Sequence, residues 1–498
     1  MSRGERVARA GRVGPPPSVG PPPSARRAAL AATVALTGLA VAPAVGAIGL
    51  ALAPAVGTFG LAVAQQAAGA PAAVTLAIVG GTLIDGNEGP PLRNAVVLVA
   101  GNRIIHVGTV DDTPIPPGAE VVDANGRTVM PGLHDAHVHV MIVGHGEYDE
   151  YFPRYGDRLR ELMPISVREL LVAGVTSARD LGAPLDDILW LKREIAEGRL
   201  PGPRMFVSGP FIQKTTGPSQ ALFRWTVDGE ADARAKTRQL IDAGVDLIKV
   251  IQADALTPGE RRVISEEARR AGLHIAAHGY DAEELAAAVE MGAATIEHVN
   301  ARPEPWYDEE SIRLMARNGV ASSFTSVVSR IYNITQDHPE RLDDPRLRAD
   351  LPPDVYEDVR ASIQYPERLG YFDQKKAINP WHAQKLKQLW EGGVQILVGT
   401  DSGTPMNFHY ESTWQEMDLL VRYGMPPMKV ISAATRLPPR LFGLGNELGT
   451  VEPGRLADVI VVDGNPLRDM SVLRNVRVVI QDGRVVARDG TLVGASSS

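Results

Sequence analysis

The 498-residue chain contains no cysteine. This absence excludes disulfide bonds, thiolate nucleophiles and thiolate metal ligands, so a bound metal ion must be held by histidine, carboxylate or a modified lysine. An excess of basic residues is also lacking, because 51 Lys and Arg stand against 59 Asp and Glu, for a formal net charge of −8. The body of the protein therefore has no electrostatic feature that predicts binding to nucleic acid or to an anionic membrane.

Charge of either sign is missing from residues 28–64, whereas residues 1–27 carry six arginines and one acidic residue. A basic segment before a long apolar one is typical of an export signal. We therefore predict that residues 1–73 are an export signal and flexible segment of a secreted or periplasmic protein. Two alternatives stay open: an uncleaved segment would be the protein's one contact with a membrane, and a segment without signal function would leave the protein in the cytoplasm.

Short β-type runs separated by Gly and Asn turns occupy residues 74–130 and return in residues 445–498. Each block is too short to bury a sheet by itself. We therefore predict that the two blocks pair into one small composite β-sandwich beside the middle of the chain. Two separate β appendages are the alternative.

The middle of the chain, residues 131–444, alternates strand patterns with amphipathic helix patterns. The eight predicted strands are Gly132–Val140, Val175–Arg179, Arg204–Ser208, Leu247–Ile251, His274–His278, Thr295–Val299, Ala321–Ser326 and Gln395–Thr400. This alternation predicts an α/β fold with a parallel sheet, and eight units predict a closed (β/α)8 TIM barrel. Residues 329–380, between the last two strands, are an insertion that we expect over the carboxyl-terminal face as part of a lid.

Six side chains with metal-binding capacity end five of these strands. In segment 131–139, which reads Pro-Gly-Leu-His-Asp-Ala-His-Val-His, residues two apart share one face of a strand, so His137 and His139 can present two imidazoles to one metal ion. The groups that end later strands are Lys249, His278, His298 and Asp401. Singly, each has a structural explanation: a core hydrogen bond, an ion pair or a helix N-cap. Together they predict a metal site, because the carboxyl ends of the strands form the catalytic face of a TIM barrel.

Other groups at this face are candidate substrate contacts. They are His145, Arg179, Tyr280 and His409.

The order of these motifs resembles the amidohydrolase superfamily of metal-dependent hydrolases. The motifs are Pro-Gly-x-x-Asp-x-His-x-His at 131–139, Gly-Val-Thr-Ser-Ala-Arg-Asp at 174–180, Ile-Lys-Val at 248–250, Ala-His-Gly at 277–279, Ile-Glu-His at 296–298 and Gly-Thr-Asp at 399–401. The tail Leu-Gly-Thr-Val-Glu-Pro-Gly-Arg-Leu-Ala-Asp at 448–458 recurs in the same superfamily. The chain is most similar to the imidazolonepropionase-like branch, which includes metal-dependent prolidases and related dipeptidases. The likeness covers about residues 74–490.

The resemblance implies a binuclear metal site. It implies that His137, His139 and Asp401 hold one divalent ion and that His278 and His298 hold a second. Lys249, carboxylated on its amine by carbon dioxide, would bridge the two ions. Zinc is the default for such a cysteine-free hydrolytic site, with manganese or cobalt as alternatives.

The predicted function is that of a metal-dependent amidohydrolase. Metal-activated hydroxide would attack the amide carbonyl, and Asp401 would carry the proton to the leaving amine. The expected substrate is a small peptide or N-acyl amino acid. The loop at 209–217 departs from the Gly-Gly-His type loop of many relatives, so the side-chain preference for the substrate stays open. A cyclic amidase, deaminase or esterase with one metal ion, and a catalytically silent binding barrel, are the alternatives. The sequence also leaves a homo-oligomer open.

Overall fold

The computed structural model describes residues 73–298 and 307–494. The predicted export signal lies outside these residues, except for its last position. Within the described ranges, no helix combines the length and the apolar character needed to cross a bilayer.

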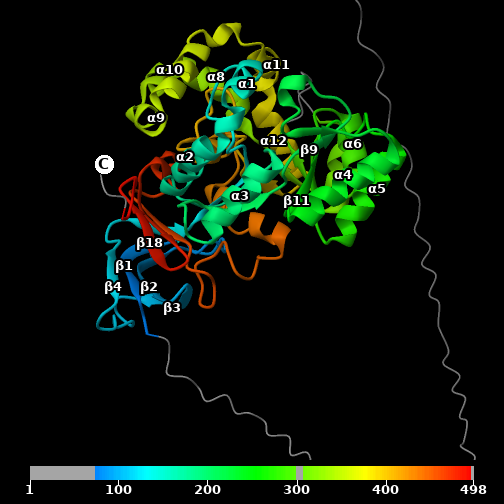
Figure 1. The fold of residues 1–498 in the computed structure, drawn as a ribbon. Coiled ribbons are helices and arrows are strands. Elements are labelled where there is room, and N and C mark those ends of the chain that lie inside the picture. Colours follow the sequence, from blue (N-terminus) through cyan, green and yellow to red (C-terminus); the bar gives the residue numbers. More distant parts are fainter. Residues whose placement is uncertain (1–72, 299–306, 495–498) are drawn as a thin grey trace, which may run out of the picture. The chain divides into compact units, whose positions relative to one another are not determined.

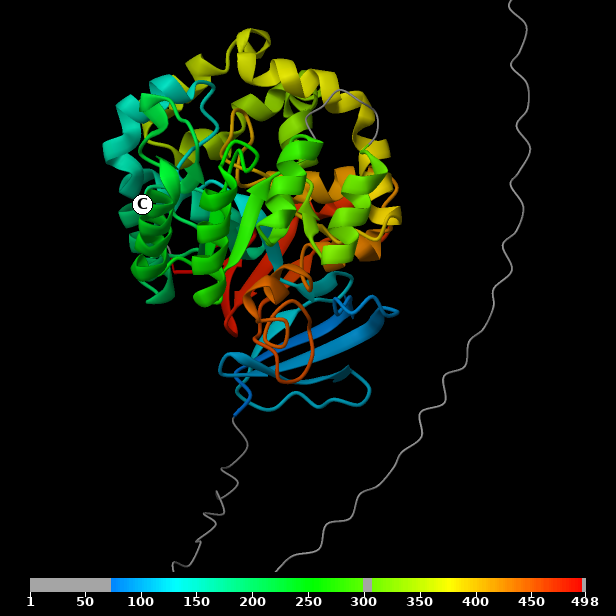
Figure 2. The same ribbon diagram turned by 90° about the vertical axis from the view of Figure 1, so that its right-hand side faces the viewer.

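The two ends of the described chain meet in one nine-stranded sheet, which we call the terminal sheet (Figures 1 and 2). Its strands are β1 Leu76–Leu83, β2 Leu92–Ala100, β3 Arg103–Thr109, β4 Glu120–Asp123, β5 Thr128–Pro131, β16 Val459–Val462, β17 Val476–Gln481, β18 Arg484–Arg488 and β19 Thr491–Leu492. The two blocks join where β5 pairs antiparallel with β16. Val97 and Val99 of the first block share a buried core with Val459 and Val461 of the second. The predicted pairing of the two blocks is thus confirmed, because neither block could bury these valines alone.

Eight parallel strands form the barrel. They are β6 Leu133–Val138, β7 Val175–Asp180, β8 Arg204–Val207, β11 Leu247–Val250, β12 His274–His278, β13 Ala293–Glu297, β14 Ala321–Ser323 and β15 Ile396–Leu397. Strands β6 to β8 form one parallel run and β11 to β15 another. Backbone hydrogen bonds connect the runs at both junctions: for example, Asp246 N–H donates to Val207 O (2.8 Å) and Ala136 N–H donates to Val398 O (2.8 Å). The predicted barrel is confirmed, and each predicted strand overlaps an observed one; Val299, at the end of the sixth, lies outside the described residues.

Helices follow the strands and cover the barrel. They are α2 Leu159–Val172, α3 Leu185–Ala196, α4 Gly229–Ala243, α5 Pro258–Arg270, α6 Ala282–Glu290, α7 Glu309–Asn318, α12 His382–Glu391, α13 Ser412–Arg422 and α14 Pro427–Ala433. Helix α5 begins with a capping box in which the Thr257 hydroxyl accepts from Glu260 N–H and the Glu260 carboxylate accepts from Thr257 N–H. Helix α4 ends at Gly244, whose φ of 94° is a left-handed conformation that favours glycine. These signals fix where α5 begins and where α4 ends, and the end of α4 sets where the next strand, β11, enters the barrel.

The insertion lies over the barrel on the side away from the terminal sheet, in yellow in Figures 1 and 2. Its helices are α8 Ser326–Asp337, α9 Pro345–Asp350, α10 Pro353–Ser362 and α11 Asp373–Ile378. It is fastened to helix α1, Tyr148–Tyr155, because Arg154 and Tyr155 both bond to the Asp358 carboxylate. Two short strands, β9 Phe211–Gln213 and β10 Arg224–Thr226, extend the sheet beside β11. The insertion, α1 and β9–β10 are the elements that surround the carboxyl ends of the strands.

Candidate active site

His137, His139 and Asp401 converge at the carboxyl ends of β6 and β15. Their ligating atoms lie within 4.8 Å of one another. Asp401 Oδ1 is 3.1 Å from His139 Nε2 and 3.5 Å from His137 Nε2. Asp401 has a φ of 58°, and its N–H donates to His137 O at 2.7 Å. A positive φ is unfavourable for a residue with a side chain, so this bond holds the carboxylate toward the two histidines.

The orientation of these two rings matches what a bound cation requires. His137 Nδ1 lies 2.9 Å from the Glu297 carboxylate and His139 Nδ1 lies 3.2 Å from Gly182 O, so each Nδ1 carries the ring proton. Each Nε2 then turns a lone pair toward the Asp401 carboxylate. Lone pairs facing one another repel unless a cation lies between them, and two ligands of one zinc ion at about 2.0–2.1 Å are themselves separated by roughly 3.3 Å. The residues therefore fit a divalent metal ion.

A second pair of imidazoles lies beside the first group. His278, at the end of β12, and His298, directly after β13, approach with their Nε2 atoms 3.1 Å apart. His298 has a φ of 71°, and its Nδ1 contacts the Thr325 hydroxyl at 3.0 Å and lies 3.9 Å from Asp401 Oδ2. Asp401 therefore lies between the two histidine pairs.

Lys249 of β11 is fully buried, and its Nζ has no hydrogen-bond partner among the described residues. Burial lowers the pKa of this amine to about 8, although the negative charge of Glu297 acts in the opposite direction. Its ammonium interacts electrostatically with Asp401 and with the rings of His137, His278 and His298. A buried, unpartnered amine is costly and is a feature of functional sites rather than of cores.

Burial also sets the protonation states of the other groups. It lowers the pKa of His137 to about 4, against the opposing hydrogen bond to Glu297. It holds the pKa values of His278 and His298 well below their ordinary value. Burial by itself would raise the pKa of Asp401, but the adjacent imidazoles of His139, His298 and His137 lower it below its usual range. Neutral imidazoles and an ionised carboxylate are the forms that bind a dication.

Buried charges behind the site position its ligating groups. Arg179 Nη2 donates to Glu297 Oε1 at 2.7 Å, and Glu297 Oε2 receives the His137 Nδ1 proton. Arg179 holds the pKa of Glu297 well below its ordinary value, against the effect of burial. On the other side, Asp135 accepts from the Thr400 and Thr413 hydroxyls at 2.8 and 2.9 Å. These contacts connect β6, β7, β13 and β15 beneath the site.

A cavity of about 110 Å³ opens onto these groups. Its lining residues are His139, Met141, Ile142, Tyr148, Phe152, Phe211, Phe223, Arg224, His278, Tyr280, His298, Tyr371, Lys375, Asp401 and Thr404. The floor comes from strand ends, and the walls come from α1, the β9–β10 region and the insertion. The cavity combines an apolar aromatic wall with two cations, Arg224 and Lys375, opposite the histidine–aspartate floor.

The four candidate substrate contacts lie in different places. Tyr280 lines the cavity, with its ring stacked on His298 at 5.4 Å. Arg179 is fully buried in the barrel, and His409 lies behind the site with Nε2 3.2 Å from His139 O. His145 is buried beside the insertion, with Nε2 3.3 Å from Asp358 Oδ2. These last three residues do not line the described cavity.

Sequence reasoning missed several groups that contribute to the site. Glu297 had a usable signal, because a charged residue inside the apolar strand β13 requires a partner. Arg224, Tyr371 and Lys375 had none, because they lie in the insertion and in the short extension at β10, whose paths no periodicity defines.

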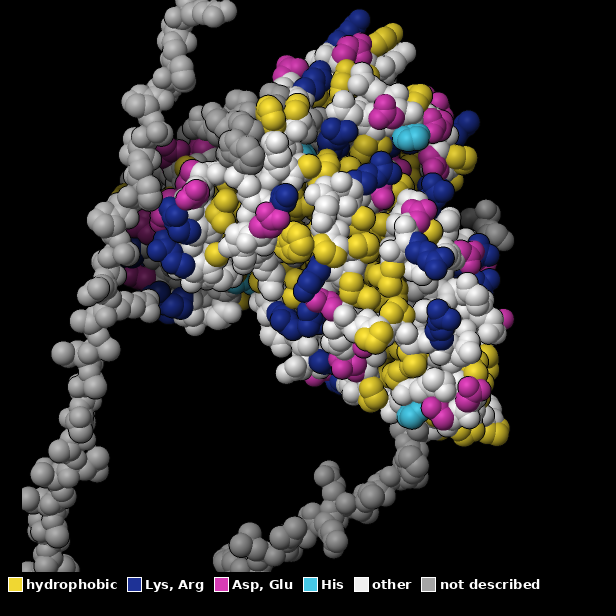
Figure 3. Space-filling view, turned by 180° about the vertical axis from the view of Figure 1, so that it is seen from behind, with side chains coloured by type: hydrophobic (Ala, Val, Ile, Leu, Met, Phe, Trp, Pro, Cys, Tyr) yellow, Lys and Arg dark blue, Asp and Glu magenta, His cyan; other side chains and the backbone are white. Residues whose placement is uncertain are grey.

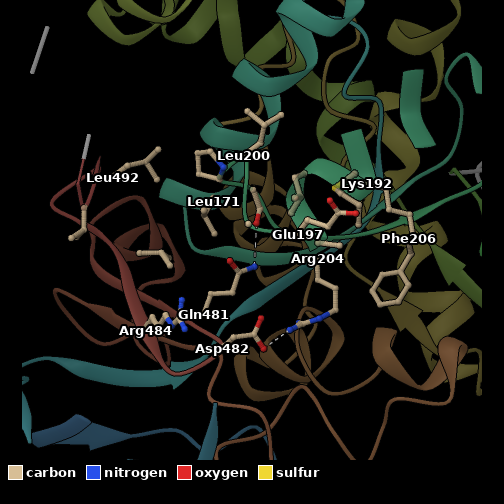
Figure 4. Close-up of a pocket in the computed structure, with 18 of the residues that line it drawn as sticks. Leu171, Lys192, Glu197, Leu200, Arg204, Phe206, Gln481, Asp482, Arg484 and Leu492 are labelled. Carbon is tan, nitrogen blue, oxygen red and sulfur yellow. Dashed lines mark hydrogen bonds and ion pairs between the residues drawn. The ribbon is translucent and has the colours of Figure 1, made fainter. Parts of the chain in front are cut away.

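A larger cavity lies elsewhere. A hollow of about 970 Å³ separates α3 and β8 of the barrel from β17–β19 of the terminal sheet (Figure 4). Its less exposed cations are paired, Lys192 with Asp246 and Arg204 with Asp482, whereas Arg484 is exposed to solvent. We place the chemistry in the small cavity, because unpartnered buried polar groups mark it and pairing satisfies those of the large one.

The barrel and the histidine–carboxylate group at the carboxyl ends of its strands define a class, the TIM-barrel enzymes. The amidohydrolase family model matches residues 128–486. An ochratoxinase from Aspergillus niger is 27% identical, over 82% of this chain and 85% of that protein. A putative prolidase from Bifidobacterium longum has a TM-score of 0.66 at 28% identity, over 84% of this chain and 96% of its own. A Xaa-Pro dipeptidase with bound methionine in its active site has a TM-score of 0.67 at 26% identity, over 82% and 99%.

The family match covers most of the chain, so the chain belongs to the amidohydrolase family. The protein is accordingly a hydrolase that acts on carbon–nitrogen bonds. Members of this family generally bind divalent metal ions, and the group His137, His139 and Asp401 is a suitable donor set.

Proposed function

We propose that the protein is a metal-dependent amidohydrolase that cleaves the amide bond of a dipeptide or an N-acyl amino acid. One observation carries the proposal: four strand-end side chains, His139, His278, His298 and Asp401, line one cavity. His137 lies directly behind them, 3.5 Å from Asp401, and the buried Lys249 amine beside them has no hydrogen-bond partner among the described residues. The similarity to a Xaa-Pro dipeptidase supports a substrate of dipeptide size.

His137, His139 and Asp401 would hold one metal ion, and His278 and His298 a second. Divalent ions at these groups would polarise the substrate carbonyl and lower the pKa of water toward about 7. Zinc suits the nitrogen-rich donor set, with manganese and cobalt as alternatives.

Lys249 would bridge the two ions after its amine takes up carbon dioxide as a carbamate. Uptake requires the neutral amine, and burial lowers the Lys249 pKa to about 8, so a useful fraction is neutral near physiological pH. The carbamate would provide the two anionic oxygens that the unmodified ammonium lacks.

Two other side chains act on the substrate. Asp401 is ionised and faces the cavity, so its carboxylate can accept the proton released by the attacking water and donate it to the leaving nitrogen. Burial raises the pKa of Tyr280, so its phenol stays protonated and can donate a hydrogen bond to the substrate carbonyl oxygen. Because Asp401 donates this proton, the leaving amine departs neutral rather than as an unstable anion.

The proposal is tested by measuring metal content and by screening the metal-loaded protein on dipeptides, N-acyl amino acids, esters and cyclic amides. Two ions per chain and turnover of linear amides are the expected result. One ion per chain with turnover of ring substrates would replace the proposal with the cyclic amidase or deaminase alternative. Bound metal with no turnover of any class would favour a silent binding barrel.

A further inference from the structure

Two cations on the cavity wall have no carboxylate partner among the described residues. The Arg224 guanidinium lies over the Phe211 and Phe223 rings, 5.3 Å from each centroid. Its Nε is buried without a hydrogen bond, and its Nη1 reaches only the Gln213 amide oxygen at 3.4 Å. Lys375 Nζ lies over the Tyr371 ring at 4.5 Å. Aromatic faces attract cations, but they leave the charge free to accept an anion.

Two other poorly exposed cations, both outside the cavity lining, are paired with carboxylates. Arg341 of the insertion bonds to Glu411, and Lys214 beside the cavity loop bonds to Glu260 at 2.7 Å. A desolvated cation without a counterion is costly, so a fold that pairs its structural cations leaves one unpaired where a ligand supplies the anion. Arg224 and Lys375 line the same cavity as Asp401, so both cations face one shared space.

The cavity offers no anionic site for a substrate cation. Among its described lining residues, Asp401 is the one carboxylate, and His137 and His139 already engage it. The free α-ammonium of a dipeptide would therefore enter a space that contains two cations and no available counterion. The remaining wall is apolar, formed in part by Ile142 and Phe152.

We propose that Arg224 and Lys375 bind the α-carboxylate of the amino acid that leaves, and that the cavity selects N-acyl amino acids with an apolar side chain and an uncharged acyl group over dipeptides with a free ammonium. This inference rests on the proposed amidohydrolase function. In the reaction, water adds its oxygen to the acyl carbon, the C–N bond breaks and the nitrogen gains a proton. The products are a carboxylic acid and a free amino acid.

Three matched substrates separate the two halves of the inference. N-isobutyryl-phenylalanine and its carboxamide differ in the α-carboxylate, whereas N-isobutyryl-phenylalanine and alanyl-phenylalanine differ in a methyl group against an ammonium. For the zinc-loaded wild type we expect kcat/KM for N-isobutyryl-phenylalanine to exceed kcat/KM for its carboxamide about 100-fold. We expect it to exceed kcat/KM for alanyl-phenylalanine about tenfold or more. Equal values within either pair would overturn the corresponding half.

Variants then assign the selectivity to the two cations. Arg224→Gln and Lys375→Gln should each lower the acid-to-carboxamide ratio roughly tenfold, mainly through KM, whereas Arg224→Lys should restore part of it. Lys376→Gln is the control, because Lys376 Nζ lies over the Tyr332 ring at 4.4 Å and 3.7 Å from Asp373 Oδ1, away from the cavity lining. A variant that slows both substrates equally has only a structural defect, and that result from both Gln variants would contradict the assignment.

A binding measurement separates failure of this inference from failure of the proposed function. Calorimetry on the zinc-loaded protein should detect binding of phenylalanine at least tenfold tighter than phenylalaninamide, with the difference reduced in Arg224→Gln. If no amide is hydrolysed but this difference is present, the proposed reaction is wrong and the carboxylate site stands. If amides are hydrolysed but phenylalanine and its amide bind alike, the reaction stands and the carboxylate site is wrong.

Discussion

The cavity at the strand ends is smaller than the hollow beside the terminal sheet, but it has more polar groups without partners. The hollow has a volume of about 970 Å³, and its less exposed cations Lys192 and Arg204 are paired with Asp246 and Asp482. The cavity has a volume of about 110 Å³, and the buried Lys249 amine near it has no hydrogen-bond partner among the described residues. Ion pairs satisfy the charges at a junction between two parts of a fold. At a reactive site some polar groups have no partner until a ligand binds, so unpartnered polar groups identify this site better than cavity volume does.

The charged side chains on the surface give a comparison for the unpaired cations of the cavity. On the face drawn in Figure 3, basic and acidic side chains are interspersed. Several of the exposed charges pair within a helix, such as Arg313 with Glu309 on α7. Pairs of this kind contribute little to stability and imply no ligand. Arg224 and Lys375 differ from these pairs because they are partly buried in a cavity and have no carboxylate partner among the described residues.

The largest expected effect distinguishes the two aspartates of these regions. Asp401→Asn should lower kcat on an N-acyl amino acid by about 10²–10⁴-fold, because an amide cannot carry the proton to the leaving nitrogen. Asp482→Asn, in the large hollow, should leave kcat unchanged. Steady-state kinetics with metal content measured on the same samples checks this, and near-normal turnover of Asp401→Asn would remove Asp401 from the mechanism.

Lys249 and Lys192 provide the second contrast. Lys249→Ala should lower the metal content from about two ions per chain to one or none, with partial rescue by a short carboxylic acid that replaces the carbamate. Lys192→Ala, which breaks the pair with Asp246, should retain both ions. Elemental analysis after dialysis measures the content. Two fully retained ions in unrescued Lys249→Ala would show that Lys249 is not a bridge.

Glu297 should show an intermediate effect, because it acts through His137. Glu297→Gln weakens the contact that fixes the His137 ring and leaves the buried Arg179 without its counterion, so metal affinity should fall about 10–100-fold. Competition with a chelator measures the affinity. Glu267→Gln, at an ion-pair network on the outer helices α4 and α5, is the matched control and should bind metal as the wild type does.

The pH dependence of reactivation should show a smaller, about tenfold effect. Burial lowers the pKa of Lys249 from 10.5 to about 8, so the neutral amine that takes up carbon dioxide rises from roughly a tenth at pH 7 to nine-tenths at pH 9. Metal-stripped protein should thus regain activity about ten times faster at pH 9 than at pH 7, at constant dissolved carbon dioxide and metal, and level off above pH 9. A rate that still rises steeply through pH 10 would indicate an unperturbed lysine.

The strand-borne half of the site could be predicted from sequence because the fold constrains it. Residues such as Lys249 and His278 end parallel strands, and those ends meet at one face whatever the loops do. The same reasoning placed Arg179, the last residue of the predicted second strand, among the groups at this face. In the structure Arg179 lies within β7, and its side chain enters the barrel interior and bonds to Glu297.

The loop-borne half could not be predicted, because residue type and proximity in sequence do not set side-chain direction. His145 and His409 follow strand ends, yet one bonds to Asp358 of the insertion and the other to the backbone behind His139. Lys375 reaches the cavity only through the path of the insertion, which tertiary contacts such as Arg154 with Asp358 define. Long-range packing of this kind leaves no periodic signal.

The smallest expected effect tests whether the two regions are independent. Arg204 bonds to Asp458 and Asp482 at 2.8 Å each, across the junction of the barrel and the terminal sheet, and Figure 4 shows the bond to Asp482. Arg204 and Asp482 are partly exposed, but Asp458 is buried and would lose its counterion. Arg204→Gln should therefore cost about 1–3 kcal/mol and lower Tm by about 2–4 °C, with kcat and metal content unchanged. Calorimetry and kinetics on one preparation check both parts. A tenfold loss of kcat would mean that the junction affects the geometry of the strand ends, because strand β8, which carries Arg204, pairs with β7 beside the site. The structural hollow and the reactive cavity would then not be independent.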